Sequence, residues 1–266
     1  MFYKDEVLFA VLPGNISGDT FFSHAGLTYA GFVMSDKATA PLMLDSFRLL
    51  LDHLRGLKGV SRVIYRPIPY IYQRYPSEED LYALFRLGGQ LVERKISSVI
   101  PQQGAYGFST LRSRKLKKAS ALGLSICEDE DFGSFWPVLE TALDERHQAK
   151  PVHSLEEVVR LQKLFPKNIL LHRVVEHNKT VAGCVVYLTD KVAHAQYIAA
   201  DASGREGGAL ELLFHHLIHE RYAGKSYFDF GISVEQGGWI LNEGLIFQKE
   251  GLGGRGVVYD GYELKL

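Results

Sequence analysis

Residues 192–214, VAHAQYIAADASGREGGALELLF, decide the fold class of this 266-residue chain. The part up to Ala200 alternates in polarity and predicts a strand, whereas Leu210, Phe214 and Leu217 recur at helical spacing and predict a helix over about 209–222. Between them lies Ser203–Ala209, whose glycines and serine are typical of a turn. A strand that leads through a turn into a helix is the building block of α/β folds.

The same reasoning, carried outward, predicts alternating strands and helices along the whole chain. In the second half we expect helices over 133–146 and from Ser154, strands over 169–176, 181–187, 192–200 and 227–230, a short helix over 241–250 and a strand over 257–266. In the first half we expect strands over 6–12, 20–22, 26–33, 62–65 and 91–100, with helices from Pro41 and Ser77. Ser154–Glu157 is a capping-box sequence, and proline is common in a first helical turn.

The two halves repeat one order of elements: three strands, a long helix, a strand, a short helix and a strand. The opening strand, the long helix and the next strand begin near residues 4, 42 and 62, and again near residues 168, 206 and 226. In both halves, the long helix begins about 38 residues after the opening strand, and the next strand begins about 20 residues after the helix start. This equal spacing indicates an internal structural repeat. Two unrelated α/β segments are the alternative.

Composition limits the class of protein. The chain is 46% hydrophobic and 23% charged, as in globular proteins, and its 30 Lys and Arg residues balance 31 Asp and Glu residues. This balance argues against nucleic-acid binding through a generally positive surface. No apolar run approaches the roughly 20 residues of a membrane span, and the amino terminus does not resemble a signal peptide, so we expect a cytoplasmic protein without membrane association. Cys127 and Cys184 form no disulfide framework, and no Cys/His set has zinc spacing, so we expect no metal.

Several short strings resemble those of one protein family. They are AHAQY at 193–197, FDFG at 228–231, LNEGL at 241–245 and KEGLG at 249–253, together with a basic run over 112–118. With the element order of the second half, they make the chain similar to tandem GNAT acyltransferases related to the Fem-type peptidyltransferases. The similarity is closer to GNAT family acetyltransferases common in Bacteroides-like bacteria.

The resemblance implies an α/β fold of two tandem GNAT-like units, each a mixed, largely antiparallel α+β sheet flanked by helices. The first unit would span residues 1–107 and lack the family's opening helices, and the second would span residues 108–266 and hold an acyl-CoA site. The implied activity is that of an N-acyltransferase, which moves an acyl group, expected to be acetyl, from acetyl-CoA to an amine of a small molecule, sugar or peptide.

The expected cofactor-binding residues lie where the third strand of the second half meets its helix. Glycines at a helix start let backbone amides approach a diphosphate. The family signature is Gln or Arg, two residues, Gly, one residue, then Gly or Ala. The sequence does not match this signature fully, whether the signature begins at Gly204 or at Arg205. The alternative is a flexible Gly-rich loop before a helix. The resemblance also implies an oxyanion donor where the third strand bulges and parts from its neighbour. The candidates are Ala199, Ala200, Gly204, Arg205, Gly207, Gly208 and Ala209.

His194 is the first candidate for the catalytic base, because a histidine titrates near neutral pH. Strand alternation places it on one face with Gln196 and Ile198. Two polar side chains on one face of a central strand favour a lined groove, although a hydrogen-bonded core histidine fits equally well. Asp229 at a strand end and Glu243 at a helix start compete for the same role. Tyr187 and Tyr259 are candidates for the acid that protonates the thiolate.

Three functional hypotheses stay open. The first is the acetyl-CoA-dependent N-acyltransferase. The second is a Fem-type transferase that takes its acyl group from aminoacyl-tRNA; it needs a positive surface for tRNA, and the neutral net charge argues against it. The resemblance implies that the basic run over 112–118 lies near an anionic acceptor. The third is a non-catalytic binding protein of the same fold, which the incomplete glycine signature favours. A solvated helix face is the alternative explanation of the basic run.

Overall fold

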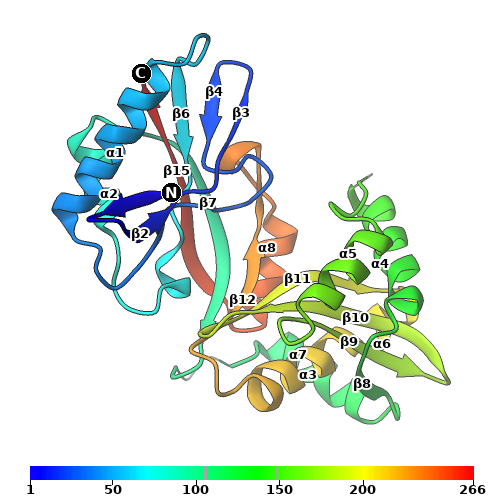
Figure 1. Ribbon diagram of the computed structural model, residues 1–266. Coiled ribbons are helices and arrows are strands. Elements are labelled where there is room, and N and C mark those ends of the chain that lie inside the picture. Colours follow the sequence, from blue (N-terminus) through cyan, green and yellow to red (C-terminus); the bar gives the residue numbers. More distant parts are fainter. Residues whose placement is uncertain (105–106, 148) are drawn as a thin grey trace. The chain divides into compact units, whose positions relative to one another are not determined.

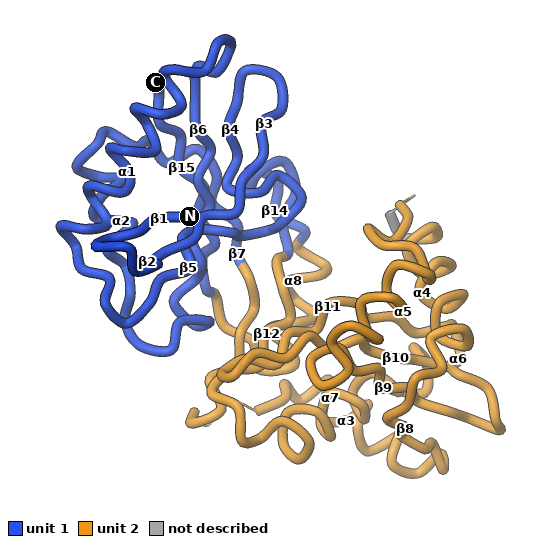
Figure 2. Tube along the Cα trace, viewed as in Figure 1, with its two compact units in different colours: residues 1–96, 233–242, 257–266 blue, residues 97–232, 243–256 orange. Residues whose placement is uncertain are grey.

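A computed structural model describes residues 1–104, 107–147 and 149–266. Within it the chain forms two compact units, which Figure 2 colours separately. Unit 1 contains residues 1–96, 233–242 and 257–266, and unit 2 contains residues 97–232 and 243–256. This division differs from the expected boundary at residue 107, because two later segments of the chain return to unit 1.

Unit 2 is built on a mixed sheet in the order β7-β12-β11-β10-β9-β8. Its strands are the second part of β7 (Gln90–Pro101), β8 (Ser125–Asp129), β9 (Ile169–Glu176), β10 (Lys179–Leu188), β11 (Val192–Ala200) and β12 (Tyr227–Ile232). Its helices are α3 (Thr110–Ser120), α4 (Phe132–His147), α5 (Leu155–Leu164), α6 (Ala202–Gly207), α7 (Ala209–His216), a π-helical turn (Leu217–Arg221) and α8 (Glu243–Gly251). Strands β8 to β11 are antiparallel neighbours, and β11 and β12 are parallel.

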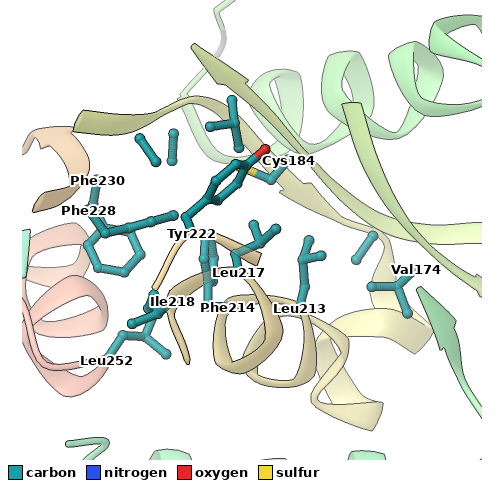
Figure 3. Packing of buried hydrophobic residues seen from close by; sticks show 14 of the residues in the cluster. Val174, Cys184, Leu213, Phe214, Leu217, Ile218, Tyr222, Phe228, Phe230 and Leu252 are labelled. Carbon is teal, nitrogen blue, oxygen red and sulfur yellow. The ribbon is translucent and has the colours of Figure 1, made fainter. Parts of the chain in front are cut away.

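Two hydrophobic clusters lie on opposite faces of this sheet. One holds Phe214, Leu217 and the strand residues Phe228 and Phe230 under α7 (Figure 3). The other holds Phe135 and Trp136 of α4 and receives apolar side chains of α5. Helices α4 and α5 therefore cover one face, and α3 and α7 cover the other (Figure 1). Cys184 is fully buried in the first cluster.

Unit 1 has five short strands before its long helix, where three were expected, and then the expected strand, short helix and strand. Its elements are β1 (Phe2–Lys4), β2 (Val7–Val11), β3 (Asn15–Ser17), β4 (Thr20–Phe22), β5 (Val33–Met34), α1 (Ala40–Arg55), β6 (Arg62–Tyr65), a 3-10 turn (Tyr70–Tyr72), α2 (Glu79–Arg86), the first part of β7, β13 (Val234–Glu235), a 3-10 turn (Gln236–Gly238), β14 (Ile240–Leu241) and β15 (Arg255–Lys265). β1, β2 and β5 form a small sheet of their own, and β4 pairs in parallel with β6. In each unit, one strand that precedes the long helix in the chain pairs in parallel with the strand that follows the helix.

Four details of local structure differ from the expectations. The strand expected over 26–33 is absent except for β5, and β3 lies between the first two expected strands, where none was predicted. The edge strand β8 was not predicted, because it is short and mixes apolar with acidic residues. The final strand β15 does not close the second unit, since it pairs with β6 of unit 1.

Within the described residues, we find no helix with the length and apolar character required to cross a bilayer.

Candidate active site

The parallel strands β11 and β12 part in the middle of unit 2. They pair through Val192 with Tyr227, Ala193 with Phe228 and His194 with Asp229, and not beyond, although both strands are described in full. β11 nevertheless stays paired with β10 as far as Ala200. His194 and Asp229 are therefore the last pair before the two strands diverge. The resemblance to GNAT proteins implied such a parting, and it lies closer to His194 than to Ala199 and Ala200.

The bulge in β11 lies at Gln196. In the register with β10, Ala195 and Tyr197 pair with consecutive residues, so Gln196 is the extra residue. Before the bulge Ala195 packs under α7, and after it Tyr197 and Ala199 pack under α4. The bulge thus shifts the alternation by one, and Ile198 joins the α7 cluster instead of sharing the face of His194. The expectation of a bulge near Ala199 and Ala200 is wrong, because both are regularly paired and buried.

His194 and Asp229 form the hydrogen-bonded pair at this parting. The His194 Nδ1 atom lies 2.8 Å from the Asp229 Oδ2 atom. The Asp229 side chain is fully buried, and its Oδ1 atom accepts hydrogen bonds from the Ser97 hydroxyl at 2.5 Å and the Gly231 amide at 2.8 Å. Because one carboxylate oxygen is held by two donors, the other is directed at the imidazole. Such an arrangement favours the imidazole tautomer with its proton on Nδ1, in which Nε2 is the basic nitrogen.

Lys249 is a further residue of this site that the sequence reasoning missed. It lies in α8, is 5% exposed, and donates hydrogen bonds of 2.8 Å to the carbonyl oxygens of Gly231 and Ile232. Burial lowers the pKa of its ammonium group to about 8, and the nearby Asp229 carboxylate partly offsets that shift. Lys249 stands in one of the strings that carry the family resemblance, but no local pattern marks a lysine as buried.

The expected phosphate-binding turn is helical. Residues 202–207 form α6, and the Asp201 side chain caps it by accepting a hydrogen bond of 2.8 Å from the Gly204 amide. The Arg205 amide donates to the Asp201 carbonyl and the Gly208 amide to the Gly204 carbonyl. The Arg205 side chain reaches the Ala200 carbonyl and the Glu145 carboxylate. The amides of Gly204, Arg205 and Gly208 are therefore engaged within the protein, and an acidic side chain stands at the helix start.

The glycines of this turn are explained by packing. A Cβ atom on Gly204 would lie 2.3 Å from the Val181 carbonyl oxygen, and one on Gly208 would lie 2.6 Å from the Lys115 carbonyl oxygen. Gly208 also has a φ of +79°, which favours glycine, and it separates α6 from α7. Gly207 is buried against Leu122, and Ala209 is buried at the start of α7. Their role in binding a cofactor stays a prediction.

Replacing Gly208 by alanine is expected to lower the free energy of unfolding. The left-handed conformation alone costs an alanine about 1–2 kcal/mol, and the clash with α3 adds to this. Gly224→Ala is the matched control, because a Cβ there meets nothing within 4 Å. Urea unfolding of both variants measures the difference. Equal stability of the two variants would show that the turn relaxes around the new methyl group.

The basic run in α3 is only partly a solvated face. Arg112 forms an ion pair with the buried Glu211 of α7, and Lys115 and Lys118 donate to the carbonyls of Arg205 and Glu206. These three side chains join α3 to α6 and α7. Arg114 and Lys117 are exposed on the outer side of the same helix. The run therefore has a structural role that the solvated-face alternative did not include.

The remaining candidates lie in different places. Glu243 is exposed in the first turn of α8, where an acidic residue favours the helix dipole. Tyr187 is the partner of His194 across β10 and β11, and burial raises the pKa of its hydroxyl to about 12. Tyr259 belongs to unit 1, where it packs against Tyr29. Among the described residues, no three His, Cys, Asp or Glu side chains are placed to hold a metal ion.

Comparison with known proteins places this geometry in context. Residues 110–237 match the sequence model of a family described as acetyltransferase (GNAT) domain. No curated protein sequence matches the chain.

Three solved structures share the fold at low sequence identity. The carboxy-terminal domain of a putative lysylphosphatidylglycerol synthetase from Agrobacterium fabrum has a TM-score of 0.66 at 14% identity, over 99% of this chain and 82% of that one. FemX has a TM-score of 0.65 at 10% identity, over 91% and 82%. A GNAT family acetyltransferase from Colwellia psychrerythraea has a TM-score of 0.51 at 12% identity, over 100% and 84%.

Proposed function

We propose that this chain is an N-acyltransferase whose catalytic base is His194, since residues 110–237 match the model of the acetyltransferase (GNAT) domain family. The observation that carries the proposal is the hydrogen bond between His194 Nδ1 and Asp229 Oδ2 at the point where β11 and β12 part. We also propose that unit 1 is a second, diverged copy of the same fold. The recurring order of its elements and its parallel strand pair support this.

The proposed reaction moves an acyl group onto an amine. The Nε2 atom of His194 takes a proton from the attacking amine while the nitrogen bonds to the acyl carbon, and the tetrahedral centre then collapses and releases the donor's leaving group. The imidazole becomes positively charged during this step, and the buried Asp229 carboxylate, held by Ser97 and Gly231, stabilises that charge. Gln196 lies at the bulge beside His194 and is proposed to orient the substrate.

Acetyl-CoA is the donor that we propose first, because the family is one of acetyltransferases. No step is assigned to residues 203–209, since the amides of Gly204, Arg205 and Gly208 are engaged. That same observation favours a second class of donor, an aminoacyl ester, which needs no diphosphate cradle. The acceptor is proposed to be an amine of a small molecule, sugar or peptide.

An assay of acyl transfer with the purified chain tests the proposal. Acetyl-CoA and aminoacyl-tRNA are offered in separate reactions with a panel of amines, and product is detected by mass spectrometry. His194→Gln is expected to lower kcat by about 10²–10⁴-fold, the usual contribution of a general base. His177→Asn is the control, because His177 lies in the β9–β10 turn at a φ of +46°, which asparagine tolerates. An active His194→Gln variant, or a parent protein inactive with both donors, contradicts the proposal.

A further inference from the structure

Lys249 combines deep burial with contacts that a purely structural lysine does not need. Lysine is seldom fully buried unless its charge is paired. The Lys249 ammonium group lies near the buried Asp229 carboxylate, whose charge counteracts the lowering of the Lys249 pKa. It donates hydrogen bonds of 2.8 Å to the carbonyls of two consecutive residues, Gly231 and Ile232, at the end of β12. Lys249 therefore contacts the backbone that carries Asp229.

Gly231 is the residue on which these contacts converge. It has a φ of +75°, and it lies where the register between β12 and β7 shifts, between Asp229 and Ile232. Its amide donates to Asp229 Oδ1, and its carbonyl accepts from Lys249 Nζ. A residue in the left-handed region within an irregular stretch is not fixed by regular sheet pairing. The Lys249 side chain supplies the fixing contact from outside the sheet.

We propose that Lys249 is a positioning residue for the pair formed by His194 and Asp229. By holding the carbonyls of Gly231 and Ile232, it keeps the Gly231 amide directed at Asp229 Oδ1, and so keeps Oδ2 directed at His194 Nδ1. Its positive charge also balances the buried carboxylate. The effect on reaction rate rests on the proposed function, whereas the effect on the His194 tautomer does not.

A second lysine of unit 2 provides a matched control. Lys225 Nζ donates to the carbonyls of Thr189 and Asp190, at 2.5 and 3.3 Å, and so holds a turn between strands in the same chemical manner. These contacts lie in the β10–β11 turn and do not involve Gly231. If Lys249 only stabilises the backbone through its hydrogen bonds, Lys249→Met and Lys225→Met should each change the free energy of unfolding and leave the His194 imidazole unchanged. If it positions the pair, only Lys249→Met should change the imidazole of His194.

The experiment is a ¹⁵N NMR study of histidine side chains in the parent, Lys249→Met and Lys225→Met. Methionine keeps an unbranched chain nearly as long as that of lysine, without the ammonium group or its charge. The parent and Lys225→Met are expected to show His194 protonated on Nδ1, whereas Lys249→Met is expected to show a mixture of tautomers. Acyl transfer by Lys249→Met is expected to fall by about 10²-fold in kcat, with little change in KM, because a small misplacement of a catalytic group has that effect.

A titration of the parent protein keeps the proposal testable if Lys249→Met does not fold. Since the pKa of Lys249 is lowered to about 8, the His194 ring signals are expected to shift between pH 7 and 9. Unchanged His194 signals in the folded Lys249→Met variant, or across that titration, overturn the proposal. A parent protein that transfers no acyl group overturns the proposed function but leaves the NMR result to decide the role of Lys249.

Discussion

Asp229→Asn is expected to lower kcat by about 10³–10⁴-fold while leaving the fold intact, as loss of the correct histidine tautomer does in other His–carboxylate pairs. The fall in kcat follows from the hydrogen-bond donors around the Asp229 carboxylate. The Ser97 hydroxyl and the Gly231 amide both donate to Oδ1, so an asparagine will turn its carbonyl oxygen to them and its NH₂ group to His194. The imidazole must then accept at Nδ1 and carry its proton on Nε2. It can no longer take a proton from an amine.

The measurement is kcat at saturating amine, together with the ¹⁵N chemical shifts of the His194 ring. Asp144→Asn is the control, because Asp144 is exposed on α4. Ser97→Ala is an intermediate case: it removes one of the two donors to Oδ1 and is expected to lower kcat by roughly the effect of one hydrogen bond, about tenfold. An Asp229→Asn variant with parental kcat would show that His194 is not the base, whatever its tautomer.

The fold was predictable from the sequence where periodic patterns are strong. The strands β9, β10 and β11 and the helices α1, α4 and α5 lie close to their expected bounds, and Ser154 forms the expected capping box. The strands β3 and β8 were not predictable, since neither has a continuous apolar face. The return of β15 to unit 1 is a long-range pairing, and local patterns contain no information about such pairings.

The site was only partly predictable, for a related reason. His194 and Asp229 were both candidates, but their hydrogen bond depends on the parallel register of β11 and β12, which no spacing along the chain encodes. The bulge at Gln196 shifted the face assignment of every later residue in β11. Glycines in the 203–209 segment have two explanations with the same composition, close approach of a ligand and close approach of backbone, and the contacts of Gly204 and Gly208 support the second.

Acid is expected to destabilise this protein in part through His172. This residue is fully buried on β9, where its Nε2 atom lies 2.6 Å from the Tyr222 hydroxyl. Burial lowers the pKa of His172 from 6.5 to about 4, and the positive charges of Arg221 and His216 act in the same direction. The Glu128 and Asp129 carboxylates partly offset that shift. At neutral pH His172 is therefore an uncharged part of the core.

The sign of the effect follows from these pKa values. The unfolded chain protonates His172 below about pH 6.5 and the folded chain only below about pH 4, so the unfolded state binds more protons between these values. Stability is therefore complete above pH 6.5 and is lost as the pH falls toward 4. The full shift corresponds to about 3 kcal/mol.

Urea unfolding at several pH values between 7.5 and 4 measures this loss. His172→Gln keeps a partner for the Tyr222 hydroxyl but does not titrate, so it is expected to lose less stability over this range than the parent, by about 3 kcal/mol at pH 4. His177→Asn is the control for removal of a histidine from a turn. Because carboxylates such as Glu128 and Asp129 titrate in all three proteins, only the difference between them reports on His172. Parallel pH profiles for the parent and His172→Gln would mean that His172 is protonated in the folded state through a relaxation of its contacts with Glu128.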